Sequence, residues 1–442
     1  MKGVGPSVYG RPCFLRTAHM KATGITAEFD PLHNGHVYLM EEARRLTGCD
    51  ALVIAMSGDF VQRGEPALTD KWSRTEAALS SGADLVIEIP ALFCLGNASQ
   101  YAKASVRLLE AAGCSQIAFG SETGDAGLIE RTAGSIKDMG GALEKEISVL
   151  AKQGFSFPAA RYRAYASLRQ GKASADETES ELSVLRGPND ILALEYVMNM
   201  KNARPVAVKR KGAPHSGGGG GSEISRSASY IRRFLSERRG EDGSFSDRLS
   251  EWMPASSVSV LSGGPLTFRD DWTGVLRYAV MSTDTAFLED CPSGGEGLGR
   301  LLKKAAHAGD GFDGIVSAVK SKRYTYTRIS RMCMQAILGI SRTKYPYSAP
   351  AYIRVLGFSE RGRELLSELR DDSSSGLPVI TNINKEEHRL SEDARMMLAL
   401  DIHASDIYNL VTCRDTVSNS DHVRNPVMTG IRQTHSQKDN HD

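Results

Sequence analysis

Two histidines in the sequence His33-Asn34-Gly35-His36 follow a predicted strand directly. Gly35 lets the backbone approach a phosphate closely, and the start of the next helix offers unpaired N–H groups and the positive end of a dipole. Two imidazoles beside these donors can bind a triphosphate and stabilise charge developing at the α-phosphate and on leaving pyrophosphate. We therefore predict that His33 and His36 are catalytic. The alternative is a pair of turn histidines that only cap and pack the helix.

A second candidate group begins a predicted helix after a glycine-rich tract, in the sequence Ser227-Ala228-Ser229-Tyr230-Ile231-Arg232. Ser227 or Ser229 can cap this helix, and Arg232 lies about one turn further on, where it can reach a phosphate. Taken with the two histidines, the segment resembles the Ser-rich, Arg-ending signature of the HxGH nucleotidyltransferase superfamily. Taken alone, it would fit an ordinary capped surface helix. We find neither a Gly-x-Gly-x-x-Gly motif after a strand nor the Lys-Ser/Thr that completes a P-loop.

The elements that must position these residues alternate between short apolar runs and amphipathic segments. Strands are predicted over residues 24–29, 51–56, 85–89, 117–119 and 205–209, and helices over about 73–81 and 99–112, with another that ends near Gly48. This alternation predicts an α/β fold with a Rossmann-like parallel sheet. Ligands of such sheets bind beyond the carboxyl ends of the strands, which is where both candidate histidines stand.

The pattern along the chain predicts four parts. Residues 1–19 form an extension that is predicted to be disordered, and residues 20–240 form the nucleotidyltransferase-like catalytic domain. Residues 241–412 read as a mainly helical C-terminal domain whose basic residues suit RNA binding. Residues 413–442 are polar and are predicted to be a disordered tail. Two further stretches, 171–183 and 215–223, are predicted to be surface loops because they are rich in small and polar residues.

The composition is that of an ordinary globular protein, with 442 residues, 41% of them hydrophobic and 24% charged. It excludes a fully disordered chain, a collagen and a coiled-coil rod. The net charge of +1 gives no overall attraction to nucleic acid, so an anionic partner must be held by local basic patches. The seven cysteines form no metal-ligand spacing, and no apolar run approaches the roughly 20 residues of a membrane helix. We expect a cytoplasmic protein with reduced thiols and no dedicated metal site.

Two basic segments can contribute to an RNA surface. Lys209-Arg210-Lys211 extends from the last predicted strand, and residues 320–331 interleave basic residues with tyrosines. This combination suits phosphate contacts together with stacking on unpaired bases. The residues predicted to bind RNA are Lys211, Lys320, Lys322, Arg323, Arg328 and Arg331. A solvated helix face is the alternative for the second segment.

From Met20 onward the chain resembles the bacterial tRNA(Met) cytidine acetate ligase family. One matching stretch is Met56-Ser57-Gly58-Asp59-Phe60-Val61-Gln62-Arg63-Gly64-Glu65-Pro66-Ala67. Others, in the family's order, are residues 28–40, 71–74, 82–90, 119–125, 187–192 and 208–213, followed by the signature that ends at Arg232. The likeness is dense to about residue 235 and continues in patches, including 323–331 and 377–382.

The resemblance implies an enzyme that activates acetate with ATP as acetyl-adenylate and releases pyrophosphate. The acetyl group then passes to N4 of the wobble cytidine of elongator tRNA(Met), and AMP leaves. Mg²⁺ is expected to accompany ATP, and the oligomeric state stays open. Asp30 stands where the family usually has Asn, which places a negative charge beside the nucleotide.

Carried over one by one, the family's ATP-contacting positions are Thr26, Ala27, Glu28, Phe29, Asp30, Pro31, Leu32, His33, Asn34, Gly35, His36, Val37, Tyr38, Leu39, Gly120, Asn189 and Arg210. Ser227 and Ser229 are added to the ATP-binding residues from the superfamily signature, and Arg232 from the same signature is predicted to be a third catalytic residue.

Two other functions fit the residues alone. A small-molecule nucleotidyltransferase would use the same phosphate site and leave AMP or CMP on its product, although a small substrate would not need the large second domain. A non-catalytic RNA-binding relative would keep the fold, although the intact His33, His36 and Arg232 argue against a decayed site. Consumption of ATP with acetate, measured with and without tRNA, separates these functions.

Overall fold

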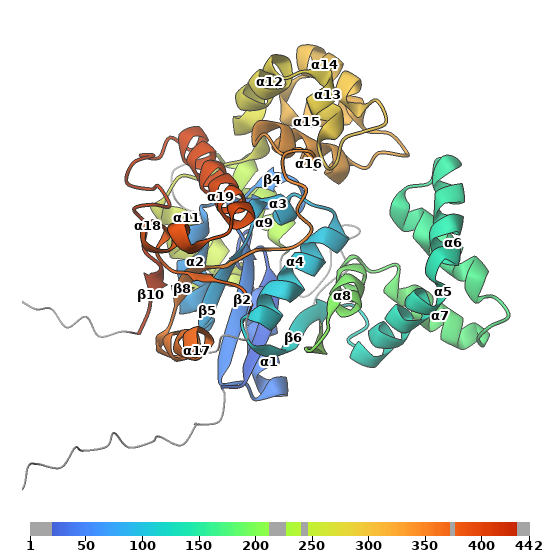
Figure 1. Ribbon diagram of the computed structural model, residues 1–442, viewed down its shortest axis with the longest axis horizontal. Helices are drawn as coiled ribbons and strands as arrows, with labels where there is room; N and C mark the ends of the chain where they lie inside the picture. The colour runs from blue at the N-terminus through green and yellow to red at the C-terminus, as the bar shows by residue number, and fades with distance from the viewer. Residues whose placement is uncertain (1–19, 212–226, 240–245, 372–375, 431–442) are drawn as a thin grey trace, which may run out of the picture.

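The computed structural model describes residues 20–211, 227–239, 246–371 and 376–430. At its centre lies a sheet in the order β10-β8-β5-β2-β1-β6-β7, with β9 also paired to β8 (Figure 1). The strands are β1 (Ala22–Ala27), β2 (Ala51–Ser57), β5 (Leu85–Ile89), β6 (Cys114–Ser121), β7 (Arg204–Lys209), β8 (Ile353–Phe358), β9 (Val379–Ile380) and β10 (Val427–Met428). Neighbours from β5 to β7 are parallel. The predicted α/β class with a parallel Rossmann-like sheet is confirmed, and each predicted strand is present.

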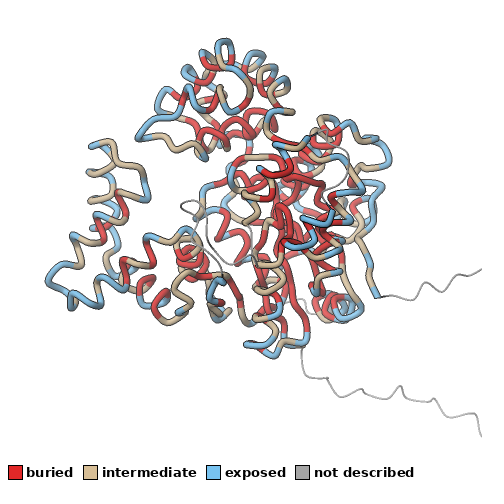
Figure 2. The backbone as a smooth tube through the Cα atoms, turned by 180° about the vertical axis from the view of Figure 1, so that it is seen from behind, coloured by how far each residue is buried: buried red, intermediate tan, exposed pale blue. Residues whose placement is uncertain are grey.

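Helices cover both faces of this sheet, because the central strands are apolar on both sides. On one face lie α1 (Asn34–Thr47) and α2 (Lys71–Ser80), which share a core with Ile25, Ile54 and Val86. On the other face α4 (Ala98–Ala111) packs so closely on β1 that a Cβ at Gly24 would lie 2.8 Å from Leu109. Figure 2 shows the buried residues concentrated in the sheet and the helices against it.

The remaining elements form smaller groups around the sheet. A short hairpin, β3 (Phe60–Val61) and β4 (Glu65–Pro66), follows β2. The elements α5 (Ala126–Lys152), α6 (Phe157–Arg169), α7 (Ala175–Val184) and α8 (Pro188–Asn199) lie between β6 and β7, and α5 to α7 project as an arm (Figure 1). Near the sheet lie α3 (Ala91–Cys94), α9 (Ala228–Glu237), α10 (Ser246–Trp252), α11 (Ala255–Gly263), α17 (Glu360–Asp371), α18 (Ile383–Glu386), η3 (Glu387–Arg389) and α19 (Glu392–Val411).

A separate helical unit, residues 269–337, stands above the carboxyl ends of the central strands (Figure 1). It comprises η1 (Arg269–Trp272), α12 (Thr273–Ser282), α13 (Thr285–Asp290), α14 (Leu298–Ala308), α15 (Gly311–Val319) and α16 (Tyr326–Ile337). Its core contains Trp272, Leu302 and Phe312, all buried. Among the described residues, no helix has both the length and the apolar character needed to cross a membrane.

The prediction that the sheet domain ends at residue 240 is wrong. Strand β8 returns to the sheet and pairs antiparallel with β5, from Leu85 opposite Phe358 to Glu88 opposite Arg354. The chain after residue 240 therefore contributes both the helical unit and one edge of the sheet. Local sequence patterns could not reveal this pairing, because it joins strands about 270 residues apart in the chain, as in the pair Leu85 and Phe358.

The prediction of a disordered tail is also wrong for residues 413–430. Asp421 is buried and pairs with Lys71 at 2.6 Å, and β10 adds to the sheet beside β8. The predicted loop at 171–183 likewise contains most of α7, which starts with a capping box of Ser174 and Glu177. Residues 1–19 and 431–442, and the predicted loop at 215–223, lie outside the described residues.

Candidate nucleotide site

The turn from β1 to α1 brings the two predicted histidines together. His33 is the N-cap of α1, and its Nδ1 accepts a hydrogen bond from Gly35 N at 3.0 Å. In return His33 N donates to His36 Nδ1 at 3.2 Å, so the two residues form a capping box. The rings stack with their centroids 3.9 Å apart, and Phe29 meets the His36 ring edge-on at 5.1 Å.

These contacts determine where each imidazole carries its proton. Because Nδ1 of both rings accepts a backbone N–H, the neutral ring carries its proton on Nε2. Burial lowers the pKa of His36 well below its usual value, and the neighbouring His33 and Arg210 lower it further. The His36 ring is therefore neutral near pH 7 and offers an N–H donor. The capping role and the phosphate-binding role are thus compatible, since they use different ring atoms.

The lowered pKa of His36 predicts a pH effect on stability. Below the ordinary histidine pKa of 6.5, the unfolded chain takes up a proton at His36 that the folded chain excludes. The free energy of unfolding is therefore expected to fall as the pH falls below this value. Urea unfolding of the wild type and of His36→Gln from pH 8 to pH 5 tests this. The wild type should lose more stability than the variant over this range, and equal losses would contradict the assignment.

A second set of predicted residues lies at the same edge, after β6 and β7. Because β1 lies between β2 and β6 in the sheet, the loops after β1 and β6 flank the point where the chain changes direction, where such sheets bind ligands. Arg210 Nη1 donates to Asn189 Oδ1 at 3.3 Å, and a Cβ at Gly120 would lie 3.5 Å from Arg210 Cγ. Gly120, Asn189 and Arg210 are thus neighbours, as their common assignment to one site requires.

Arg232 reaches this edge from α9, but carboxylates bind it. Its Nη1 lies 2.8 Å and 2.7 Å from the two oxygens of Asp30, and its Nη2 lies 3.3 Å from Glu65 Oε2. Asp30 Oδ1 also accepts from Leu68 N at 2.6 Å. A phosphate that binds Arg232 must therefore compete with Asp30. The two signature serines have local roles, since Ser227 caps α9 and Ser229 Oγ accepts from Arg63 at 2.7 Å.

Several residues predicted to contact ATP are core residues. Ala27, Phe29 and Leu32 are buried in the core that α1 shares with the sheet, and Val37 and Leu39 pack against it. These positions can offer backbone groups, not side chains, to a nucleotide. Tyr38 is half-buried, and Lys211 Nζ lies 4.1 Å from its ring centroid. The other members of the turn, Thr26, Glu28, Pro31 and Asn34, lie on the same loop or beside it.

Sequence reasoning missed Arg74 and Glu122, which hold the site loops. The buried Arg74 donates to the carbonyls of Glu28 at 2.7 Å and of Ser57 at 3.0 Å, and so ties together the ends of β1 and β2. Glu122 Oε1 accepts from Asn189 Nδ2 at 2.6 Å and so orients that amide. Arg74 lies in the matched stretch 71–74, and Glu122 lies in the matched stretch 119–125. Both stretches were singled out without a role for these residues.

Comparison with known proteins places this geometry in a family. The family described as "HIGH Nucleotidyl Transferase" matches residues 20–422. A tRNA(Met) cytidine acetate ligase of Clostridium perfringens is 32% identical over 92% of this chain and 100% of its own length, and one of Thermoanaerobacter is 33% identical over 91% and 98%. The chain belongs to the tRNA(Met) cytidine acetate ligase family.

Solved structures of this ligase family agree with the fold. Thermotoga maritima TmcAL bound with alpha-thio ATP is 28% identical, covers 92% of this chain and 99% of its own, and gives a TM-score of 0.81. The apo form of the same protein gives a TM-score of 0.82. The resemblance stated from the sequence is therefore confirmed.

The basic segment of this ligase family member lies at the start of α16. Lys320, Lys322 and Arg323 are exposed, and Arg323 pairs with Glu296 at 3.2 Å. Arg328 donates to the carbonyls of Ser293 and Gly294, both at 3.0 Å, so its guanidinium is engaged within the helical unit.

Arg331 differs from these neighbours. Its Nη1 donates to the Gln62 carbonyl at 3.3 Å, and among the described residues no carboxylate pairs with it. Burial lowers the pKa of Arg331 to about 10, with a smaller contribution from Arg328. Arg331 therefore carries an uncompensated positive charge where the helical unit meets the hairpin.

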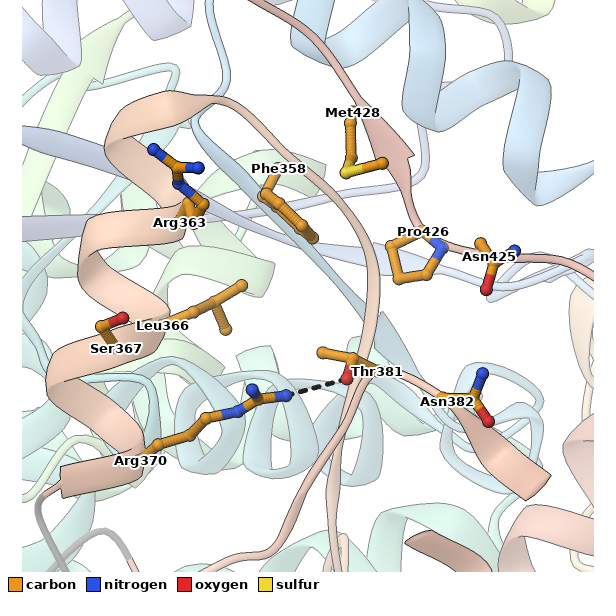
Figure 3. Close-up of a pocket in the computed structure, with 10 residues that line it drawn as sticks. All are labelled: Phe358, Arg363, Leu366, Ser367, Arg370, Thr381, Asn382, Asn425, Pro426 and Met428. Carbon is orange, nitrogen blue, oxygen red and sulfur yellow. Dashed lines mark hydrogen bonds between the residues drawn. The ribbon is translucent and has the colours of Figure 1, made fainter. Parts of the chain in front are cut away.

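A pocket of about 320 Å³ lies at the β8 edge of the ligase fold, away from the histidines (Figure 3). Arg363, Leu366 and Arg370 of α17 form one wall, and Phe358 and Met428 lie opposite. Because Phe358 pairs with Leu85 at the start of β5, this part of the pocket lies near the amino ends of the parallel strands. In the described ranges no group of three or more His, Cys, Asp or Glu side chains is placed to hold a metal ion.

Proposed function

We propose that this protein uses ATP and acetate to acetylate N4 of the wobble cytidine in elongator tRNA(Met). The observation that carries the proposal is the convergence of His33, His36, Gly120, Asn189 and Arg210 at the sheet position that binds ligands, in a member of the tRNA(Met) cytidine acetate ligase family. The match to TmcAL bound with alpha-thio ATP supports ATP as the nucleotide.

The first step joins acetate to AMP. A carboxylate oxygen of acetate attacks the α-phosphorus of ATP, the bond to the β-phosphate breaks, and pyrophosphate leaves with the electron pair. The Nε2–H groups of His33 and His36 and the N-terminus of α1 stabilise the charge that develops on the phosphates. Little covalent help from the protein is needed, because alignment and charge stabilisation supply most of the rate.

In the second step the N4 amine of cytidine attacks the acetyl carbonyl carbon. The bond from that carbon to the adenylate oxygen breaks, AMP leaves, and the nitrogen loses a proton. The wobble base lies in an unpaired loop, so splaying it into a pocket costs less than flipping a base from a duplex. Exclusion of water from the acetyl-adenylate is required in both steps, since the mixed anhydride is labile.

The RNA surface belongs to the same proposal. Phosphate contacts are assigned to Lys211, Lys320, Lys322, Arg323, Arg328 and Arg331, as expected from the sequence. The exposed Lys320, Lys322 and Arg323 support this assignment, as does the uncompensated charge of Arg331. Arg328 is the weakest member, because backbone carbonyls already bind its guanidinium.

Mg²⁺ is proposed to enter with ATP. Mg²⁺ usually retains several waters and binds through one or two carboxylates together with the substrate's phosphates. Three carboxylates beside the histidine turn are Glu28, Asp30 and Glu65, and the last two are paired with Arg232. Glu28 accepts from Gln62 N at 2.8 Å, and burial raises its pKa. These residues fit a metal carried by the nucleotide better than a resident metal.

Mass spectrometry of unmodified elongator tRNA(Met) tests the proposal. The tRNA is incubated with the purified protein, ATP, Mg²⁺ and isotope-labelled acetate. Labelled N4-acetylcytidine at the wobble position, with AMP formed, is the expected result. Cleavage of ATP without labelled tRNA would point to another acceptor, as in a small-molecule nucleotidyltransferase. Binding of tRNA without cleavage of ATP would favour the non-catalytic RNA-binding function.

Replacing His36 by alanine is expected to lower the rate of tRNA acetylation by about 10²–10³-fold, the usual effect of losing one preorganised donor to a developing oxyanion. The helix should remain, because His33 still caps it. Circular dichroism and acetylation rates measure the two effects. His307→Ala removes an exposed histidine of α14 and should retain the wild-type rate. Full activity in His36→Ala would remove His36 from the phosphate site.

A further inference from the structure

The hairpin β3–β4 lies within the matched stretch 56–67, directly after β2. It stands between the nucleotide loop and the helical unit, with β4 below α16 (Figure 1). Phe60 anchors it by packing against Trp272 of the helical unit, with ring centroids 5.2 Å apart. Both side chains are buried, so the hairpin is a fixed part of this junction.

On the nucleotide side the hairpin contacts the candidate site through three polar groups, those of Gln62, Arg63 and Glu65. Gln62 N donates to Glu28 Oε1 at 2.8 Å, directly after β1. Arg63 Nη1 donates to Ser229 Oγ at 2.7 Å, at the start of α9. Glu65 Oε2 pairs with Arg232 Nη2 at 3.3 Å. The hairpin therefore contacts both the phosphate loop and the helix that carries Arg232.

On the other side the same hairpin contacts α16. Ser330 Oγ donates to the Gly64 carbonyl at 2.6 Å, and Arg331 Nη1 donates to the Gln62 carbonyl at 3.3 Å. Gly64 has a φ of 80°, and a Cβ there would lie 2.3 Å from Arg331 N. Only glycine permits this conformation and this approach of two backbones. The hairpin and the proposed RNA-binding segment are thus in direct backbone contact.

One carboxylate oxygen of the hairpin joins its nucleotide side to its α16 side. Glu65 Oε2 lies 3.3 Å from Arg232 Nη2 and 3.4 Å from Arg269 Nη1. Arg269 Nε in turn lies 2.9 Å from Asp313 Oδ1, which also accepts the hydroxyl of Tyr326, the first residue of α16. An unbroken chain of ion pairs and hydrogen bonds therefore runs from Asp30 through Arg232 and Glu65 to α16.

We propose that Glu65 is a positioning residue that couples RNA binding at α16 to nucleotide binding at Arg232. This inference rests on the proposed function, which assigns RNA to α16, and on the prediction from the sequence that Arg232 binds a phosphate. RNA bound to α16 holds Tyr326 and Arg269 in place, and Arg269 then holds Glu65. Arg232 then loses less conformational entropy when a nucleotide binds, so the nucleotide binds more tightly in the presence of RNA.

Equilibrium binding tests the coupling without turnover. The dissociation constant of an ATP analogue with a methylene bridge between the α- and β-phosphates is measured with and without unmodified elongator tRNA(Met). In the wild type, tRNA should tighten analogue binding by at least about fivefold, and the analogue should tighten tRNA binding by the same factor. In Glu65→Gln, and separately in Arg269→Gln, this factor should fall below about twofold.

The matched control is Glu237→Gln, which makes the same change on α9 at an exposed position outside the chain of contacts. It should keep the wild-type factor. The coupling factor is the ratio of the analogue's dissociation constants without and with tRNA. A coupling factor of one or less in the wild type, or an undiminished coupling factor in both Glu65→Gln and Arg269→Gln, would overturn the inference. Acetylation of tRNA by the same wild-type preparation is assayed in parallel. If tRNA is acetylated but the coupling factor is one, only the coupling is refuted. If the coupling is present but tRNA is not acetylated, only the proposed function is refuted.

Discussion

Asp30→Asn is expected to lower the dissociation constant for ATP by about tenfold. Both oxygens of Asp30 pair with Arg232, and a phosphate that binds Arg232 must displace them. Removing one negative charge this close to a polyanion changes its binding by more than about 1.4 kcal/mol when the effective dielectric constant is near 20. The asparagine oxygen can still accept from Leu68 N, so the turn should keep its shape.

Isothermal titration with the methylene-bridged ATP analogue measures this change. Glu41→Gln removes the same charge from an exposed position on α1 and should shift the dissociation constant much less. Weaker binding in Asp30→Asn would mean that the carboxylate orients Arg232 for the nucleotide instead of competing with it. An unchanged constant would separate Arg232 from the nucleotide altogether.

Asp421→Asn should lower the free energy of unfolding by about 3–5 kcal/mol, the usual cost of removing one partner from a buried ion pair. Lys71 Nζ lies 2.6 Å from Asp421 and 2.8 Å from Glu88, and all three side chains are buried. Burial alone would lower the pKa of Lys71, but the two carboxylates raise it, so the amine stays charged. In Asp421→Asn the Lys71 amine keeps Glu88 as a paired carboxylate, and the positive charge of the buried Arg354 remains nearby.

Guanidinium unfolding of the full chain measures this loss through the transition midpoint. Asp415→Asn makes the same change at an exposed position of the same segment and should shift the midpoint little. A midpoint in Asp421→Asn equal to that of the wild type would show that the Lys71–Asp421 pair does not hold the segment 413–430 in place.

Local sequence patterns were sufficient to predict the parallel strands and the histidine turn. Continuous apolar runs such as residues 51–56 predicted β2, because a strand buried on both faces has no polar alternation. The spacing of His33 and His36 predicted a helix start, because both residues act within one turn of α1. The family resemblance added Gly120, Asn189 and Arg210, which no local pattern connects.

Long-range contacts were missed because composition does not reveal them. The polar segment after residue 412 resembles a disordered tail, yet Asp421 attaches it to a buried amine and β10 pairs with β8. The pairing of β8 with β5 and the bridge of Glu65 between Arg232 and Arg269 join parts of the chain that carry no mutual sequence signal. The loop prediction at 171–183 was wrong for another reason, since the Ser174–Glu177 capping box in it is a local helix signal.

The attachment of Asp421 to Lys71 has a consequence for how the protein is made. These two residues are 350 positions apart, so a growing chain displays Lys71 on α2 long before its partner has been synthesised. At about 5–20 residues per second, synthesis of that interval takes on the order of 20–70 seconds. During this time β5 also lacks its neighbour β8, which leaves an open strand edge on the ribosome-bound chain. Chaperones that shield unpaired strand edges are therefore expected to matter more for the yield of this protein than for one whose sheet closes locally.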